Sequence, residues 1–288
     1  MRDIEGALGL IGGWPVPAAA AAVVGAGGVL GRYGPTDRPF RLASVTKPLA
    51  TLAVLVAIEE GAVELTDPAG PPGSTVRHLL AHASGLAMDG APAAPRVVAG
   101  PGTRRIYSNA GFEALGAHLA ARTGIPFGEY FAEAVCRPLG LTGTRLDGSP
   151  AYGATSTVDD LAAVARELLH PTVIHRDTLA EATAVQFAGL PGVLPGFGRQ
   201  HPNDWGLGFE VRSGKSPHWT GSRNSPSTFG HFGQSGTFLW VDPVAGVGCV
   251  VLTDRDFGGW AAQEWPTLSD AVLGTVGAGH VRSRYGPP

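Results

Sequence analysis

The sequence predicts an α+β fold, in which an antiparallel sheet is flanked by helices and an all-helical subdomain is inserted into it. Two stretches with the alternation and glycine turns of β-hairpins lie at residues 18–33 and 237–253, toward opposite ends of the chain. Residues 62–195 between them show helical periodicity and loops instead. We therefore expect residues 1–61 and 196–288 to form one discontinuous sheet subdomain around the helical one, the whole acting as a single functional domain.

Helical patterns accompany both hairpins. Residues 2–11 carry apolar side chains at helical spacing, and residues 265–276 predict an amphipathic helix near the end of the chain. An apolar run at 49–58, followed by a glycine, predicts a buried helix with a glycine stop. The alanine-rich stretch 18–24 would also suit a helix, but the glycine turn and a valine pair favour a strand.

The middle of the chain supplies further helix signals. Helices are predicted at 110–123, 126–136 and 157–169, each with a plausible cap or first-turn proline. Residues 85–103 are small and proline-rich without a period, which indicates a surface loop. Residues 205–211 then alternate in polarity and predict a strand.

The composition is that of an ordinary globular protein. The chain has 288 residues, of which 44% are hydrophobic and 16% charged, with a formal net charge of −3. This balance offers no basic surface to nucleic acid. The apolar stretch at 16–30 is too short and glycine-rich to cross a membrane. Because the N-terminus also lacks the pattern of a signal peptide, we expect a cytoplasmic protein with no nucleic-acid or membrane partner.

A serine and a lysine three residues apart stand at the start of the buried helix. Lys47 is one of only two lysines among 21 basic residues. Ser44 and Lys47 would share one face of the helix, about one turn apart. Pro48 fits only near a helix start, which places Ser44 at the positive end of the helix dipole. An apolar interior lowers the pKa of a lysine, so that it can activate a serine nucleophile. The ordinary alternative is an N-cap serine beside a solvated lysine.

Two further polar stretches stand out in this chain. One is Tyr107-x-Asn109, at the junction of a loop and a helix; the other is His231-x-Gly233, which leads into a strand. Together with the serine and lysine, and in this order, they resemble the motifs of the serine β-lactamase and penicillin-binding-protein superfamily. The closest resemblance is to its class C β-lactamase, D-alanyl-D-alanine carboxypeptidase and esterase branch. Supporting stretches match in register at 77–86, 138–144 and 205–208.

This resemblance spans about residues 16–255 and implies a β-lactamase-like fold, with the nucleophile helix at the interface of the two subdomains. It implies that Ser44 is the acylated nucleophile and that Lys47 and Tyr107 handle its proton, either one as the acylation base. We expect the Lys47 ammonium to lower the pKa of Tyr107. The acyl substrate would be a small molecule, and no cofactor is implied.

The resemblance also implies the substrate-binding residues. Asn109 would bind the substrate amide or orient the lysine, and His231 would position the tyrosine or the substrate carboxylate. Gly233 would let the substrate approach the strand closely. The backbone N–H groups of Ser44 and Gln234 would form the oxyanion hole.

Some of these residues have simpler interpretations. A packed role beside Phe232 is the alternative for His231. The aromatic side chains of Trp205, Trp219 and Phe232 are candidates for the wall of the acyl pocket. His78 and His82 have the spacing of metal ligands on a helix, but no third ligand is apparent, so we expect no metal site.

The chain departs from the β-lactamases of this branch in three respects. His231 replaces the lysine of the third motif, the chain is short for the family, and no export signal is visible. All three favour a cytoplasmic esterase or amidase that acts on small acyl substrates. We expect an esterase that acts on small carboxylic esters through a Ser44 acyl-enzyme. The alternatives are a D-alanyl-D-alanine carboxypeptidase or weak β-lactamase, an acyltransferase, and a non-catalytic penicillin-binding or sensor protein.

Overall fold

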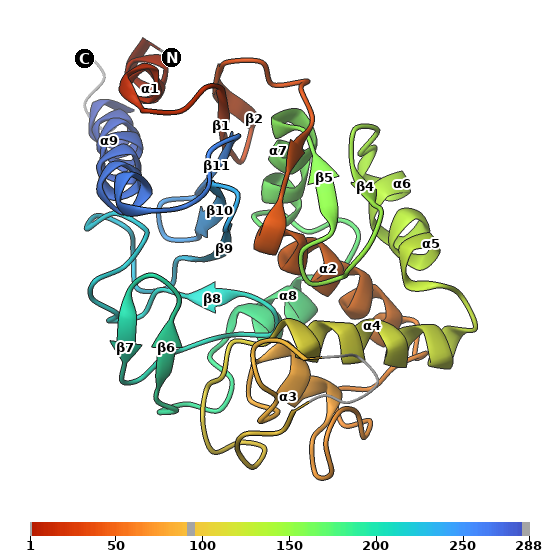
Figure 1. The fold of residues 1–288 in the computed structure, drawn as a ribbon. Helices are drawn as coiled ribbons and strands as arrows, with labels where there is room; N and C mark the ends of the chain where they lie inside the picture. The colour runs from red at the N-terminus through yellow and green to blue at the C-terminus, as the bar shows by residue number, and fades with distance from the viewer. Residues whose placement is uncertain (1, 91–95, 284–288) are drawn as a thin grey trace.

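The computed structural model describes residues 2–90 and 96–283. Its main sheet has six strands in the order β2-β1-β11-β10-β9-β8, and each pairs antiparallel with its neighbours (Figure 1). Both predicted hairpins are confirmed, and they join where β1 pairs with β11. The strands are β1 (Ala19–Gly25), β2 (Gly28–Tyr33), β8 (Glu210–Val211), β9 (Phe229–Gly233), β10 (Thr237–Asp242) and β11 (Val247–Thr253).

Helices cover both faces of this sheet. On one face α1 (Arg2–Leu8) packs against α9 (Gly259–Ser283), and on the other α7 (Val158–Glu167) packs on β1 and β11. Successive residues of β1 therefore enter different cores: Ala21 belongs to the cluster with α1 and α9, and Ala22 to the cluster with α7. A strand covered on both faces shows no polar alternation, which explains its alanine-rich sequence.

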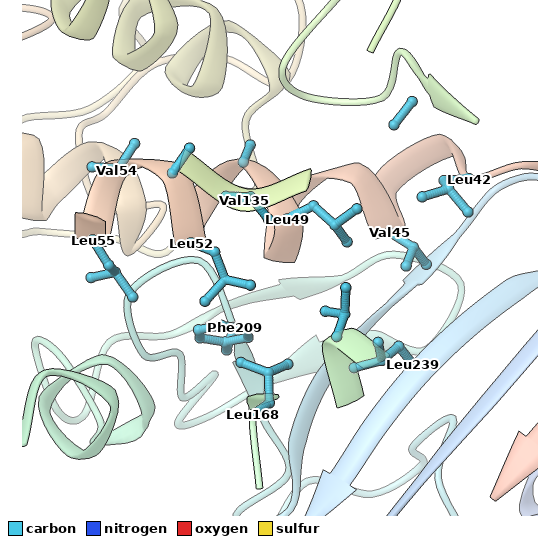
Figure 2. Close-up of a cluster of buried hydrophobic side chains, with 14 of the residues drawn as sticks. Leu42, Val45, Leu49, Leu52, Val54, Leu55, Val135, Leu168, Phe209 and Leu239 are labelled. Atoms are coloured by element: carbon cyan, nitrogen blue, oxygen red, sulfur yellow. The ribbon is translucent and has the colours of Figure 1, made fainter. Parts of the chain in front are cut away.

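The helix α2 (Thr46–Glu59) is buried around most of its surface, as its apolar sequence predicted. It follows the short 3₁₀ turn η2 (Ala43–Val45). Figure 2 shows Leu49 and Leu52 on the side of α2 that faces Phe209. The other neighbours of α2 include β9, α4 (Asn109–Thr123) and α5 (Phe127–Phe131), so its first turn lies at the boundary between the sheet and the helical part.

The remaining elements are short. The helices are α3 (Val76–Leu80), α6 (Arg137–Leu139) and α8 (Arg176–Thr183), with a 3₁₀ turn η1 (Gly9–Gly13) and a π-helical turn η3 (Ala132–Cys136). One small sheet has the order β3-β5-β4, formed by β3 (Phe40–Arg41), β4 (Arg145–Leu146) and β5 (Ala154–Ser156). Another pairs β6 (Gly192–Leu194) with β7 (Gly198–Gln200). Within 2–90 and 96–283, no helix is both long and apolar enough to cross a bilayer.

Two predictions from the sequence need correction. The stretch 62–195 is not all helical, because it contains β4, β5 and β6, and its α7 packs on the main sheet. These strands have two or three residues, too few for alternation to reveal them. The predicted strand at 205–211 is also wrong, since only its last two residues form β8. The chain turns back between Trp205 and Glu210, which pair with each other across a turn containing Gly208 at φ +73°.

Gly208 offers a test of how closely this turn packs on α2. A Cβ at this position would lie 1.8 Å from Oγ1 of Thr51. Gly208→Ala should lower the free energy of unfolding by about 2–4 kcal/mol, from left-handed backbone strain together with overpacking. Gly246→Ala is the matched control, because Gly246 has φ +67° and open space around it. Gly246→Ala should lower the free energy of unfolding by about 1–2 kcal/mol, from backbone strain alone. Equal losses in urea unfolding would contradict close packing at Gly208.

Candidate active site

Lys47, in the first turn of α2, is fully buried. Its Nζ donates to Oδ1 of Asn109 at 2.7 Å and to the carbonyl oxygen of Ala151 at 2.9 Å. It also lies 2.7 Å from Oη of Tyr107 and 3.4 Å from Oγ of Ser44. The structure therefore brings the two residues of the first motif together with both residues of the second.

Burial acts in opposite directions on the two titratable groups. It lowers the pKa of Lys47 well below 10.5, although the charges of Asp89 and Glu113 oppose the shift. Burial raises the pKa of Tyr107 above its ordinary value of 10, against the effect of its hydrogen bond to Ser44. The expectation that Lys47 lowers the pKa of Tyr107 is thus wrong for the resting site, because desolvation dominates. Desolvation thus favours the neutral form of both groups.

The hydrogen bonds determine where the lone pair of that neutral amine points. Oδ1 of Asn109 and the carbonyl of Ala151 can only accept, so they engage both N–H groups of the amine. The third position of Nζ faces Oη of Tyr107: it donates there when the amine is protonated and offers its lone pair there when the amine is neutral. Oη of Tyr107 is also 2.7 Å from Oγ of Ser44. The phenol therefore bridges the serine and the lysine, which are farther apart from each other.

The serine is presented by a tight turn packed against β9. Ala43, just before Ser44, adopts φ +45°, a left-handed conformation that costs an alanine about 1–2 kcal/mol. A Cβ on Gly233 would lie 2.3 Å from the carbonyl oxygen of Leu42 and 3.2 Å from the backbone nitrogen of Ser44. Glycine is thus required at 233 for the strand to approach the serine turn. Gln234 follows directly and lines the same cavity as Ser44.

The second motif is held in place by its flanking residues. Ser108 caps α4, accepting from the backbone of Gly111 at 2.9 Å, and its own backbone N–H donates to Nδ1 of His82 at 3.1 Å. Nδ2 of Asn109 donates to Oδ1 of Asp89 at 2.8 Å, which turns Oδ1 of the amide toward the lysine. Sequence reasoning missed Asp89. Its only signal is that it is the single acidic residue in a small, proline-rich loop.

His78 and His82, the two histidines with metal-ligand spacing, have different structural roles. His82 positions the second motif, and its ring lies 4.7 Å from that of Tyr107 in a tilted arrangement. His78 instead caps α3, its Nδ1 lying 2.9 Å from Oγ1 of Thr75.

His231 is buried between Tyr107 and Trp205, with ring centroids 5.7 and 5.5 Å away. Its Nδ1 lies 2.6 Å from the carbonyl oxygen of Phe232. A carbonyl can only accept, so Nδ1 carries a proton. Burial, together with the charge of Lys47, lowers the pKa of His231 to about 3. This side chain is therefore a packed, neutral imidazole and supplies no positive charge to a substrate.

A small cavity of about 70 Å³ opens beside the serine. Tyr107 and His231 line it on the polar side. Of the three aromatic side chains expected there, Trp205 and Phe232 line the cavity, whereas Trp219 packs behind Phe232 with centroids 5.8 Å apart. The apolar wall is completed by Met88, Leu194 and Pro195.

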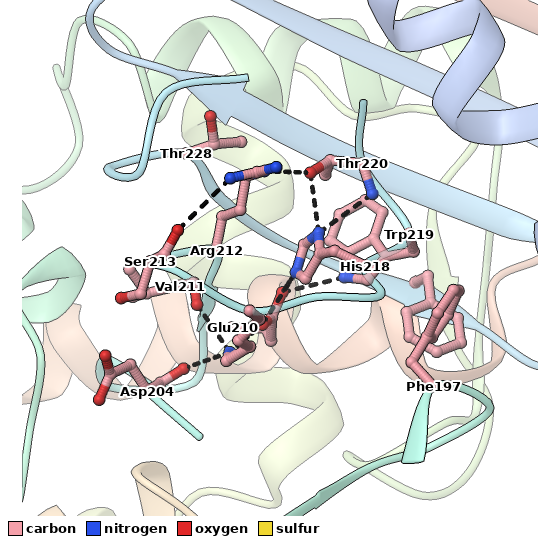
Figure 3. Close-up of polar contacts among 12 residues, drawn as sticks. Phe197, Asp204, Glu210, Val211, Arg212, Ser213, His218, Trp219, Thr220 and Thr228 are labelled. Atoms are coloured by element: carbon pink, nitrogen blue, oxygen red, sulfur yellow. Dashed lines mark hydrogen bonds and ion pairs between the residues drawn. The ribbon is translucent and has the colours of Figure 1, made fainter. Parts of the chain in front are cut away.

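Glu210 also lines the cavity, and sequence reasoning did not identify it. Figure 3 shows the polar network behind it. Its carboxylate accepts from Nζ of Lys215, from Nε2 of His218 at 2.9 Å and from Nε1 of Trp219 at 2.9 Å. Burial would raise the pKa of Glu210, but His218 and Lys215 hold it below its usual range. The second lysine of the chain thus neutralises a buried carboxylate at the cavity wall.

Comparison with solved structures identifies close relatives of this fold. A β-lactamase from Mycobacterium bovis is 61% identical and superposes with a TM-score of 0.91, covering 94% of this chain and 99% of that one. EstCE1, described as a hydrolase with promiscuous acyltransferase activity, is 20% identical with a TM-score of 0.76, covering 94% and 98% of the two chains. The second likeness concerns the fold alone.

Comparison of sequences also finds relatives of this chain. D-alanyl-D-alanine-carboxypeptidase/endopeptidase AmpH of Escherichia coli (strain K12) is 29% identical over an alignment of 147 residues, and the match covers 40% of this chain. The matched part spans only 38% of AmpH. A family model described as Beta-lactamase matches residues 12–273, most of the chain. The chain therefore belongs to the β-lactamase family of hydrolases, within the serine β-lactamase and penicillin-binding-protein superfamily whose motifs its sequence carries.

Proposed function

We propose that this hydrolase cleaves small carboxylic esters through an acyl-enzyme on Ser44. The observation that carries the proposal is the bridge from Ser44 through Tyr107 to the buried amine of Lys47, with 2.7 Å between each pair of neighbouring atoms. Such a chain can remove the serine proton at the moment of attack, which general-base catalysis requires.

In the proposed reaction, Oγ of Ser44 attacks the ester carbonyl carbon and gives its proton to Oη of Tyr107. Tyr107 passes its own proton to the lone pair of Lys47, so that neither a free phenolate nor a free alkoxide accumulates. The backbone N–H groups of Ser44 and Gln234 donate to the oxyanion. When the C–O bond to the alcohol breaks, the ammonium returns the proton to the leaving oxygen through Tyr107. Water then cleaves the acyl-enzyme by the same proton path.

The charges around the site favour an ester without a carboxylate next to the reacting bond. His231 is neutral, Glu210 is balanced by Lys215, and Asp89 adds a negative charge near the amine. A carboxylate beside the reacting carbonyl would find no free cation among the residues that line the 70 Å³ cavity. The small volume in turn suits an acyl or alcohol group of a few carbon atoms.

A D-alanyl-D-alanine carboxypeptidase or β-lactamase is the second candidate. The descriptions of the M. bovis relative and of AmpH favour it. Both substrates carry a carboxylate near the reacting carbonyl, however, and this site offers it a neutral imidazole. Wild-type turnover of nitrocefin or of a D-Ala-D-Ala peptide at a rate comparable with ester turnover would favour this candidate over the esterase.

Acyl transfer and stable acylation are further alternatives. EstCE1 is described as having promiscuous acyltransferase activity. If the acyl group passes to alcohols, added alcohol will raise the share of transferred product. If the protein is a sensor, intact-mass spectrometry will show a stable adduct on Ser44 without turnover.

Replacing the proposed nucleophile is the first test. Ser44→Ala should abolish turnover of p-nitrophenyl acetate and labelling by a fluorophosphonate, because no other group at the site can carry the acyl chain. Ser227→Ala, at an exposed serine, is the control and should behave as wild type. Turnover that survives Ser44→Ala would refute the proposal.

Replacing the bridging phenol tests the proton path. Tyr107→Phe keeps the ring that packs on His82 but removes the hydroxyl between Ser44 and Lys47. We expect kcat for ester hydrolysis to fall by about 10²–10⁴-fold with little change in KM. Tyr152→Phe, on the surface, is the control. A near-normal rate in Tyr107→Phe would indicate direct transfer over the 3.4 Å between serine and lysine.

The lowered pKa of Lys47 predicts a pH profile. Lys47 is a base only when unprotonated, and its active form accumulates as pH rises through a pKa well below 10.5. Tyr107 keeps its proton over the same range because its pKa is raised. We therefore expect kcat/KM to rise with pH and to level off before pH 10.5. A rate that keeps rising at and beyond this pH would show that the pKa of the Lys47 amine is not lowered.

A further inference from the structure

Exposed apolar side chains gather beside the small cavity. Met88, Val98 and Val193 are 47%, 47% and 53% exposed, and they line a second cavity of about 320 Å³. This groove shares Met88, Tyr107 and Pro195 with the cavity at the serine, so the two are adjacent. Apolar surface gathered at an active-site entrance marks a place where a ligand binds.

Hydrogen bonds hold both walls of the groove. On one side, the carbonyl oxygen of Met88 accepts from the backbone of Asn109 at 2.7 Å, which ties this wall to the start of α4. On the other, the backbone N–H of Arg105 donates to the carbonyl of Pro191 at 3.0 Å, next to Val193. The buried guanidinium of Arg105 donates to backbone carbonyls of neighbouring loops, including that of Asn203 at 3.0 Å.

The remaining charged residue of the groove is Arg104. Arg105 is buried, whereas Arg104 is exposed and lines the groove together with the apolar side chains. The arginine ion pairs formed by the described residues involve other arginines. Arg104 is thus a cation available to a ligand in an otherwise apolar groove.

We propose that this groove binds the longer arm of the ester, an apolar chain that ends in a carboxylate or a similar anion held by Arg104. The inference rests on the proposed ester hydrolysis at Ser44. The shorter arm fits the 70 Å³ cavity, and the longer one passes over Met88 and Tyr107 into the 320 Å³ groove. Asp89 disfavours an anion near the amine, whereas Arg104 favours one at the far end.

Binding can be measured apart from turnover. Calorimetry should show that the wild-type protein binds octanoate about three- to five-fold more tightly than 1-octanol, the effect of one exposed ion pair. Arg104→Gln should remove this preference and Arg104→Lys should retain most of it. Arg145→Gln, at an exposed arginine on β4, is the matched control and should leave it unchanged. No preference in the wild-type protein, or the same preference in Arg104→Gln, would overturn the proposal.

Kinetics then identify which arm of the ester carries the anion. The first pair is p-nitrophenyl octanoate and the mono-p-nitrophenyl ester of suberate, with the anion on the acyl arm. The second is octyl acetate and the acetate ester of ω-hydroxyoctanoate, with the anion on the alcohol arm. Arg104→Gln should raise KM about three- to five-fold for the anionic member of one pair, leaving kcat and the neutral member unchanged.

The outcomes separate this proposal from the one on which it rests. Octanoate binding that depends on Arg104, without ester turnover, would refute ester hydrolysis at Ser44 but support the groove as a binding site for an anionic chain. Ester turnover with no effect of Arg104→Gln on either pair would refute the groove alone. A dimer in sedimentation that Val193→Asp converts to a monomer, together with no octanoate binding, would show that a second copy covers the groove instead.

Discussion

The site depends on an amine held without contact with water. Nζ of Lys47 lies among Asn109, Ala151, Tyr107 and Ser44, which come from α4, the loop before β5, the loop before α4 and η2. Within residues 2–90 and 96–283 no carboxylate bonds it directly, so burial lowers its pKa and favours a neutral base at the end of a chain of hydroxyl groups. The apolar helix α2, buried between the sheet and α4, is what keeps water away from it. The remaining features of the site serve to fix the partners of this amine.

The titratable groups at the cavity walls are likewise neutral or paired. His231 stands at the position of the family's third motif, but its burial and its bond to the carbonyl of Phe232 make it neutral. With Glu210 paired to Lys215, none of the residues that line the cavity carries a free charge. We propose that the inner cavity therefore disfavours ions and that Arg104 offers a cation farther out, in the groove. This charge balance is what supports our proposal of an ester substrate over one with a carboxylate at the reacting centre.

Local patterns predicted the parts of the fold that local physics determines. The buried helix α2 and both hairpins follow from periodicity and turn residues, and the motifs at 44–47 and 107–109 meet as the family resemblance implied. The partnership of Asp89 with Asn109 could not be predicted, because it joins residues of no shared pattern across a loop. The raised pKa of Tyr107 was missed for a different reason: the sequence shows which charge lies near a phenol but not how much water is lost around it.

The most direct test is the pKa of Lys47 itself. Because the chain has only two lysines, lysine labelled with ¹³C at Cε should give two NMR signals, and Lys215→Arg assigns them by removing one. We predict that the Lys47 signal titrates well below 10.5, and that acylation of Ser44 perturbs it. A Lys47 signal that titrates at 10.5 or above would mean that the amine stays protonated, and it would contradict the account of Lys47 as the base.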